Sequence, residues 1–328
     1  MSPAALPLLP MPPSSLPSLP PSPPPPLLPA LAALAVLMVM APLLPGLAVK
    51  TRAVLTGRRG APVMQLYHDL WKLLRKSAVI SPTTSWLFRA GPVAVIVSTV
   101  AAALLLPLDG HAAILSFAGD LVAFAGLLAL ARFALVLAGL DTGSSFEGMG
   151  ASREVTFAAF AEPALLLCFA ALALATGDLT LRGMLGAPLQ SAWPRAGAPL
   201  ALVGISLFVL LLAECSRGPV DDPATHLELT MIHEVIVLDH AGPDFALVLL
   251  GGALKLALFG ALVVGVFTPR AGLGAAAAIA VLAAGLAAVA IAVGVVESIM
   301  ARLRLRRVPQ LLVGASALAL FGILLLLR

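Results

Sequence analysis

The sequence predicts an all-α protein, a polytopic membrane helix bundle of about eight transmembrane helices with one amphipathic surface helix. Of the 328 residues, 60% are hydrophobic and 11% are charged, whereas about a quarter of the residues in a soluble domain are charged. The hydrophobic residues fall in long blocks, and about 20 apolar residues cross the hydrocarbon core as a helix. No segment alternates with period two, which excludes a transmembrane barrel.

The charge pattern and the cysteines exclude several functions. The net charge is +4 and the isoelectric point about 9.6, yet the basic residues flank the apolar blocks as in oriented membrane helices, so no nucleic-acid partner is expected. Cys168 and Cys215 form no CxxC pair. We therefore expect no metal site and no cofactor in this chain alone, with a disulfide as the less favoured alternative.

The chain divides into a tail and one membrane domain. Residues 1–29 are rich in proline, including four consecutive prolines at 23–26, and predict a disordered tail. Residues 30–328 form a single transmembrane domain. Its spans are expected at 30–49, 88–107, 112–138, 155–176, 197–214, 243–267, 272–296 and 309–327.

Basic residues alternate between the connections and predict the orientation. The first connection is strongly basic with Asp69 its one acid, the second holds Asp109 and His111, and the last carries four arginines. By the positive-inside rule the basic connections are cytoplasmic. The expected protein is a multi-pass protein of a bacterial or archaeal inner membrane, with its termini on the other side. Its major cytoplasmic loops are expected near 50–87, 139–154, 215–242 and 297–308.

One stretch of the first connection has helical amphipathicity. Leu66, Leu70 and Leu73 recur on one face, and His68 and Lys72 lie on the other. This pattern predicts a helix at the membrane surface, in contact with the lipid bilayer. A short helix packed under a partner protein is an equally good and compatible interpretation.

Ionisable residues inside apolar spans are functional candidates, because each costs several kcal/mol in lipid. Pro163 follows Glu162 and frees a backbone carbonyl one turn earlier. Lys255 lies deep in its span, so it is either half of a buried ion pair or a member of a proton path. The residues of this kind are Asp120, Arg132, Glu162, Glu214, Lys255 and Glu297.

Two connections are unusual in composition. The loop 215–242 is acidic where basic residues are expected, and its histidines at 226, 233 and 240 recur every seven residues. A metal site would need closer ligands, so a polar network facing a protein partner is favoured, followed by a proton relay. The connection 139–154 is glycine-rich but lacks a Gly-Lys-Ser/Thr ending, so it favours close packing at a protein interface, with Ser152 capping the next helix.

These motifs resemble a known family. The runs Leu-Asp-Thr-Gly-Ser-Ser-Phe at 140–146 and Pro-Val-Asp-Asp-Pro-Ala-Thr-His-Leu-Glu-Leu-Thr at 219–230, together with 60–76, resemble the membrane subunit shared by respiratory complex I (its subunit 1) and membrane-bound [NiFe]-hydrogenases. The sequence looks closer to formate hydrogenlyase subunit 4 and the hydrogenase-4 membrane component. The resemblance covers about 30–327.

The resemblance implies a membrane anchor that docks a hydrophilic redox arm and links it to proton translocation, without catalytic residues of its own. Nickel–iron and iron–sulfur centres are expected in partner subunits: hydrogenase large and small subunits and iron–sulfur subunits, with antiporter-like membrane subunits beside them. The expected coupling residues are Glu162, Asp221, Glu228, Lys255, Glu214 and Glu297. The expected interface residues are Arg58, Arg59, Asp141, Arg153, Glu154, Arg217, Asp222, His226, His233 and Glu234.

Two alternatives are considered beside this function. The first is a quinone-site subunit of a complex I type dehydrogenase, although Ala224 and His226 replace acids of that family's loop and weaken this alternative. The second is a stand-alone transporter, which predicts an internal repeat that the sequence does not offer.

Overall fold

The computed structural model describes residues 27–110, 113–221, 231–268 and 270–328, and every regular element among them is helical. The predicted tail therefore lies almost wholly outside the described residues. The elements are α1 (Leu27–Met40), α2 (Leu43–Leu55), α3 (Gln65–Leu74), α4 (Trp86–Leu105), α5 (Asp120–Asp141), α6 (Ser145–Thr176), α7 (Leu181–Leu185), α8 (Ala187–Glu214), α9 (His233–Ile236), α10 (Gly242–Phe267), α11 (Ala275–Ile299), η1 (Leu305–Arg307) and α12 (Val308–Leu326).

Seven helices in the described ranges are long and apolar enough to cross a membrane, or eight if the bent pair α1 and α2 is one span. The two helices meet at 46°, where Pro42 and Pro45 lack the N–H groups that would continue one helix. Tyr67 Oη donates a hydrogen bond to the carbonyl of Val39 at this break. The predicted all-α membrane bundle is confirmed, with its first span broken in two.

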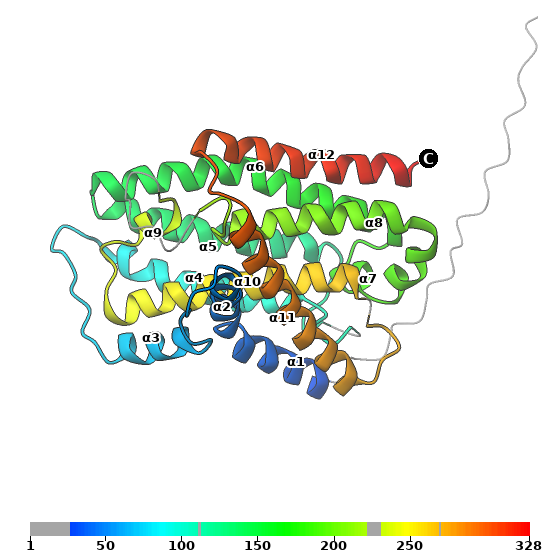
Figure 1. Ribbon diagram of the computed structural model, residues 1–328, viewed down its shortest axis with the longest axis horizontal. Helices are drawn as coiled ribbons and strands as arrows, with labels where there is room; N and C mark the ends of the chain where they lie inside the picture. Colours follow the sequence, from blue (N-terminus) through cyan, green and yellow to red (C-terminus); the bar gives the residue numbers. More distant parts are fainter. Residues whose placement is uncertain (1–26, 111–112, 222–230, 269) are drawn as a thin grey trace, which may run out of the picture.

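The helices pack around α10, most of whose residues are buried. In Figure 1, α6, α8, α10 and α12 run along the long axis, while α11 crosses them at a steep angle and packs on α2. Gly294 allows this crossing, since a Cβ there would lie 2.5 Å from the carbonyl oxygen of Ala48. Buried side chains from α1, α2, α4–α8 and α10–α12 form one continuous apolar core.

The expected loop at 139–154 is corrected by the structure. Helix α5 continues to Asp141 and α6 begins at Ser145, so a short turn replaces the loop, and Ser152 lies inside α6 instead of capping it. The small residues serve helix packing, because a Cβ on Gly150 would overlap the side chain of Val235 in α9. The same small residues therefore fit a helix with a close neighbour as well as they fit a loop.

Two further boundaries refine the prediction. The span expected from 197 belongs to the longer α8, but the helix is kinked at Ala196, between Pro194 and Pro199, where φ is −124° and ψ is 28°. The predicted start therefore marks the kink. The amphipathic stretch forms α3 as expected, and α3 packs alongside α10 and α2.

Candidate functional site

The centre of the site is Arg132, a buried side chain on α5. Its Nη1 lies 2.5 Å from Glu162 Oε1, and its Nη2 lies 2.5 Å from Glu214 Oε2. Its Nε lies 3.5 Å from Glu154 Oε1. The planar guanidinium carries five N–H donors, so one arginine contacts carboxylates from α6 and from the end of α8.

Lys255 on α10 joins the same group, with its Nζ 2.7 Å from Glu214 Oε2. We call these five residues the Arg132 cluster: Arg132, Glu154, Glu162, Glu214 and Lys255. The cluster sets three carboxylates against two cations, so its formal charge is −1 when all are ionised. Uptake of one proton would make it neutral.

The carboxylates of the cluster differ in exposure. The side chain of Glu214 is 7% exposed and that of Glu154 is 11% exposed, but that of Glu162 is 48% exposed. Glu162 lies in the middle of α6 and is not among the residues that line the neighbouring cavity. An ionised carboxylate in contact with lipid is costly. A polar partner packed on this side of α6 would therefore lower the free-energy cost of exposing Glu162.

A cavity of about 510 Å³ opens beside the cluster. Its charged lining comes from cluster residues together with Asp221, His233 and Glu234. Its apolar walls come from α3, α4, α5 and α10, through residues such as Leu66, Val95, Leu135 and Val248. The cavity is therefore amphipathic, with both charged and apolar side chains in its lining.

Two ion pairs link the loop that follows α8 to the end of α11 and to the connection after α11. Asp221 Oδ1 lies 2.6 Å from Nη2 of Arg302, and Asp221 Oδ2 accepts a hydrogen bond from the N–H of Ile232 at 3.0 Å. Arg217 Nη1 lies 3.8 Å from Glu297 Oε1. The connection before α12 is thus held against the loop that follows α8.

The cavity wall also carries a histidine and a cysteine outside the spans. Burial is the largest influence on His233 and lowers its pKa, so the neutral imidazole is favoured. Burial raises the pKa of Cys215 to about 12, so the thiol stays protonated. Cys168 is buried elsewhere and donates to Ser206 Oγ at 3.2 Å. Both cysteines are free, and the disulfide alternative is overturned.

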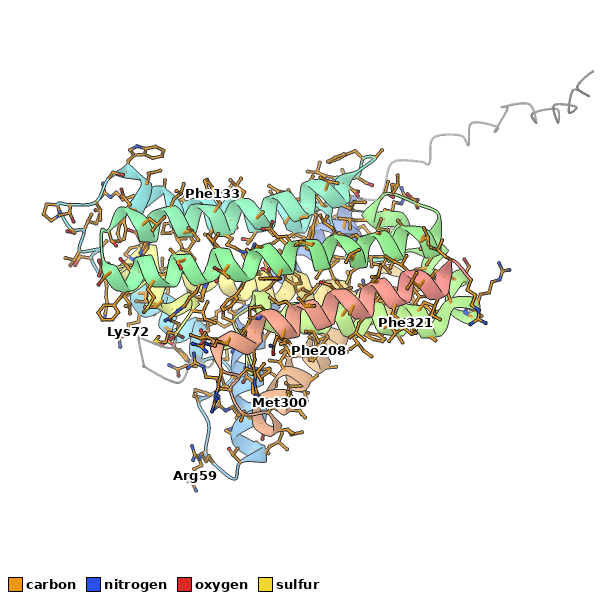
Figure 2. The ribbon with its side chains drawn as sticks, turned by 90° about the horizontal axis from the view of Figure 1, so that it is seen from above. Arg59, Lys72, Phe133, Phe208, Met300 and Phe321 are labelled. Carbon is orange, nitrogen blue, oxygen red and sulfur yellow. The ribbon has the colours of Figure 1, made fainter. Side chains whose placement is uncertain are left out.

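The predicted interface residues divide into two groups. Arg58 and Arg59 are exposed after α2, and Figure 2 shows Arg59 at the tip of a projecting part of the chain. The others among the described residues are engaged within the molecule. Asp141 accepts from Ser85, Arg153 donates to the Met231 carbonyl, Glu154 and Arg217 form ion pairs, and His233 and Glu234 line the cavity.

Three predicted site residues, Asp222, His226 and Glu228, lie outside the described residues. The sequence marks Arg132 as a candidate inside an apolar span, yet the expected coupling residues do not include it. Glu154 is expected at an interface, whereas the structure brings it into the cluster. Asp120, another intramembrane acid, accepts the N–H of Leu181 at 2.7 Å and so fastens the start of α5 to α7.

Comparisons with known proteins agree with this architecture. Residues 28–327 match the protein family described as NADH dehydrogenase. Hydrogenase-4 component C of Escherichia coli (strain K12) is 34% identical over 70% of this chain and 71% of its own length. Formate hydrogenlyase subunit 4 of the same organism is 33% identical over 83% of this chain and 89% of its own length.

More distant relatives extend the comparison. NADH-ubiquinone oxidoreductase chain 1 of Triticum aestivum is 27% identical over 67% of this chain and 70% of its own length. Among solved structures, a chain of the membrane-bound sulfane sulfur reductase, an archaeal respiratory membrane complex, superposes with a TM-score of 0.79. It is 21% identical, with 92% of this chain and 99% of that chain covered, so this likeness shows the fold.

Proposed function

We propose, because this chain belongs to the NADH dehydrogenase family, that it is the membrane anchor and ion-coupling subunit of a membrane-bound hydrogenase or formate hydrogenlyase-type complex. The relatives at 34% and 33% identity are named as components of hydrogenase-4 and formate hydrogenlyase, while the NADH-ubiquinone oxidoreductase chain stands at 27%. This order of similarity supports a hydrogenase-type assembly.

In this proposal the chain holds no redox centre. The loops 215–242 and 297–308 face the cytoplasm and dock the redox arm. That arm consists of hydrogenase large and small subunits and iron–sulfur subunits, which carry the nickel–iron centre and the clusters. Antiporter-like membrane subunits lie beside the chain in the bilayer. Positively charged connections on one side of the spans support this orientation.

The observation that carries the coupling role is the Arg132 cluster, with three carboxylates against two cations. Charge interactions are strong where water is excluded. A change of charge in a docked partner near Asp221 and Arg302 would therefore alter which cluster carboxylate holds a proton. Lys255 and Arg132 balance the carboxylates that remain ionised.

Glu162 supplies the direction of transfer in this proposal. Its half-exposed carboxylate lies at the outer surface of α6, while Glu214 and Glu154 lie inside. A proton passed from Glu214 or Glu154 to Glu162, the third carboxylate paired with Arg132, would leave the chain there. A neighbouring membrane subunit that covers this face would receive it and would also remove the cost of exposing a carboxylate to lipid.

The test is proton translocation by the complete complex in sealed vesicles, with Glu162→Gln and Lys255→Met. Each variant should lower translocation by at least about tenfold, the size expected for loss of a positioned proton donor or acceptor. Hydrogen turnover measured in detergent should change much less. Asp69→Asn on the surface of α3 is the matched carboxylate control. Translocation at the wild-type rate in both variants would refute the coupling role.

A second candidate, the quinone-site subunit of a complex I type dehydrogenase, draws support from the cavity beside the cluster. Its volume of about 510 Å³ and its apolar walls fit an apolar molecule with a polar head. Organic extraction of the gently purified complex, followed by mass spectrometry, distinguishes the two candidates. Bound quinone with a NADH-oxidising arm favours the second, and nickel with no quinone favours the first. Membership of this family disfavours the stand-alone transporter.

A further inference from the structure

His240 is a buried histidine to which the proposed function gives no role. It lies in the connection between α9 and α10 and is 5% exposed. Its ring packs on the ring of Phe88, in the first turn of α4, with the two centroids 4.0 Å apart and the planes tilted by 45°. The Phe88 carbonyl acts on the imidazole electrostatically. Within the described ranges of the chain, however, neither Nδ1 nor Nε2 makes a hydrogen bond of normal geometry.

The side chain of His240 lines the same cavity as the Arg132 cluster. Val237 and Leu238 line it as well, and Leu238 is 47% exposed, so the stretch 237–240 forms a wall between the cavity and the surface. Buried polar groups are nearly always paired with protein or with ordered water. The cavity volume of about 510 Å³ is far larger than one water needs. We therefore expect the imidazole to bond water inside the cavity.

Acidic residues accompany His240 at the surface. Asp239 is exposed, and its N–H donates to Glu147 Oε1 at 3.0 Å. Asp244, in the first turn of α10, is half-buried. The charges of Asp239 and Asp244 both act on the imidazole and favour its protonated form. A group of negative charges raises the local concentration of cations, protons included.

A second histidine of the same cavity, His233, lies nearer the cluster. The charges that act on His233 include those of Glu154, Lys255 and Arg132. The charges that act on His240 are instead those of Asp239 and Asp244. Across one cavity, His240 therefore stands on the side of the exposed acid and His233 on the side of the cluster.

A neutral imidazole in this position can pass a proton inward. Burial is the largest influence on His240 and lowers its pKa, so one ring nitrogen carries a proton and the other offers a lone pair. The lone pair takes a proton from water on the surface side, while the N–H gives its proton to water in the cavity. One proton has then moved, the ring is neutral again, and a turn of the ring restores the first tautomer. Histidine serves as a proton shuttle in this way in other proteins.

We propose that His240 is the port through which protons enter the cavity and reach the Arg132 cluster. The inference rests on the proposed function, because it names the entry point that proton translocation through the cluster requires. With three carboxylates against two cations, the cluster can take up one proton and become neutral. His240 supplies that proton from the surface side, and Glu162 releases it at the outer surface of α6.

The experiment measures proton translocation by the complete complex in sealed vesicles, with His240→Phe and His240→Ala. His240→Phe keeps an aromatic ring against Phe88 but has no nitrogen, and translocation should fall at least about tenfold. His240→Ala should fall as far, and added imidazole should restore part of the rate. Pyrrole, a ring of the same size without a basic nitrogen, should not restore it. His68→Phe, on the exposed face of α3, is the matched histidine control and should translocate at the wild-type rate.

Two outcomes would overturn the proposal. The first is translocation at the wild-type rate by His240→Phe. The second is loss of translocation in both variants that imidazole does not restore, because His240 would then serve only the structure of the connection. A wild-type complex that moves no protons would instead refute the proposed function, and the port with it. Hydrogen turnover in detergent should stay near the wild-type level in each variant, which shows that the complex is assembled.

Discussion

At the scale of single residues, Arg132 links more of the site than any other side chain described. It contacts Glu162 and Glu214 at 2.5 Å and Glu154 at 3.5 Å, so three carboxylates share one guanidinium. Removing one partner of a buried ion pair leaves an uncompensated charge, which typically costs about 3 to 5 kcal/mol. The position of this arginine therefore serves the fold of the site as well as any proton transfer.

His233 gives a prediction for pH at the same scale. Burial lowers its pKa in the folded chain, whereas the unfolded chain protonates it near the ordinary value of about 6.5. The unfolded state then binds more protons below that pH, so acid should destabilise the fold by up to about 1.4 kcal/mol per pH unit through this group. His233→Gln should flatten the fall in thermal midpoint between pH 7 and pH 5.

The control for this prediction is His68→Gln, because His68 is exposed on α3. Carboxylates also titrate in this range, so the measured quantity is the difference between variant and wild type in detergent. An identical pH dependence for His233→Gln and wild type would show that His233 is not held neutral by the fold.

At the scale of elements, prolines and glycines decide how the helices meet. Pro42 and Pro45 break the first span, and Tyr67 of the neighbouring α3 satisfies a carbonyl that the break releases. Gly294 brings α11 against α2, and Gly150 brings α9 against α6. The broken span and the steep crossing thus follow from local backbone chemistry combined with close packing.

Gly294→Ala tests the α2–α11 crossing. Its Cβ would lie 2.5 Å from the Ala48 carbonyl oxygen and 2.8 Å from Thr51 Cβ, so the helices must separate. We expect a loss of about 1 to 3 kcal/mol of stability, as for other overpacked sites, seen as a lower thermal midpoint. Gly126→Ala on α5 is the control, with no atom within 4 Å of its added Cβ. Equal thermal midpoints for the two variants would mean that α11 moves away from α2 without any loss of stability.

At the scale of the whole molecule, charged networks connect the interior of the bundle to the loops that follow α8 and α11. The Arg132 cluster reaches from the middle of α6 to the end of α8, and the Asp221–Arg302 pair lies in the loops beyond it. Any signal from a docked partner would therefore arrive beside the cluster. The orientation of these loops toward the cytoplasm is itself a prediction.

Single-cysteine labelling checks that orientation. Arg59→Cys and Arg195→Cys, in a background with Cys168→Ala and Cys215→Ala, place thiols at two exposed positions, one after α2 and one just before the kink of α8. A membrane-impermeant thiol reagent should label Arg195→Cys in cells whose outer envelope has been permeabilised. It should label Arg59→Cys only in inverted vesicles. The reverse pattern would invert the topology.

Hydropathy and helical period are local properties, so the amino-acid order alone is enough to predict the helical bundle, seven intact spans, the amphipathic α3 and the intramembrane charges Glu162, Glu214 and Lys255. The partners of those charges depend on packing between distant segments. Arg132 and Glu214 are 82 positions apart and meet because α5 and α8 both pack against α6. The helical character of 139–154 and the break at Pro42 also required the neighbours, since small residues and prolines fit several backbones until packing selects one.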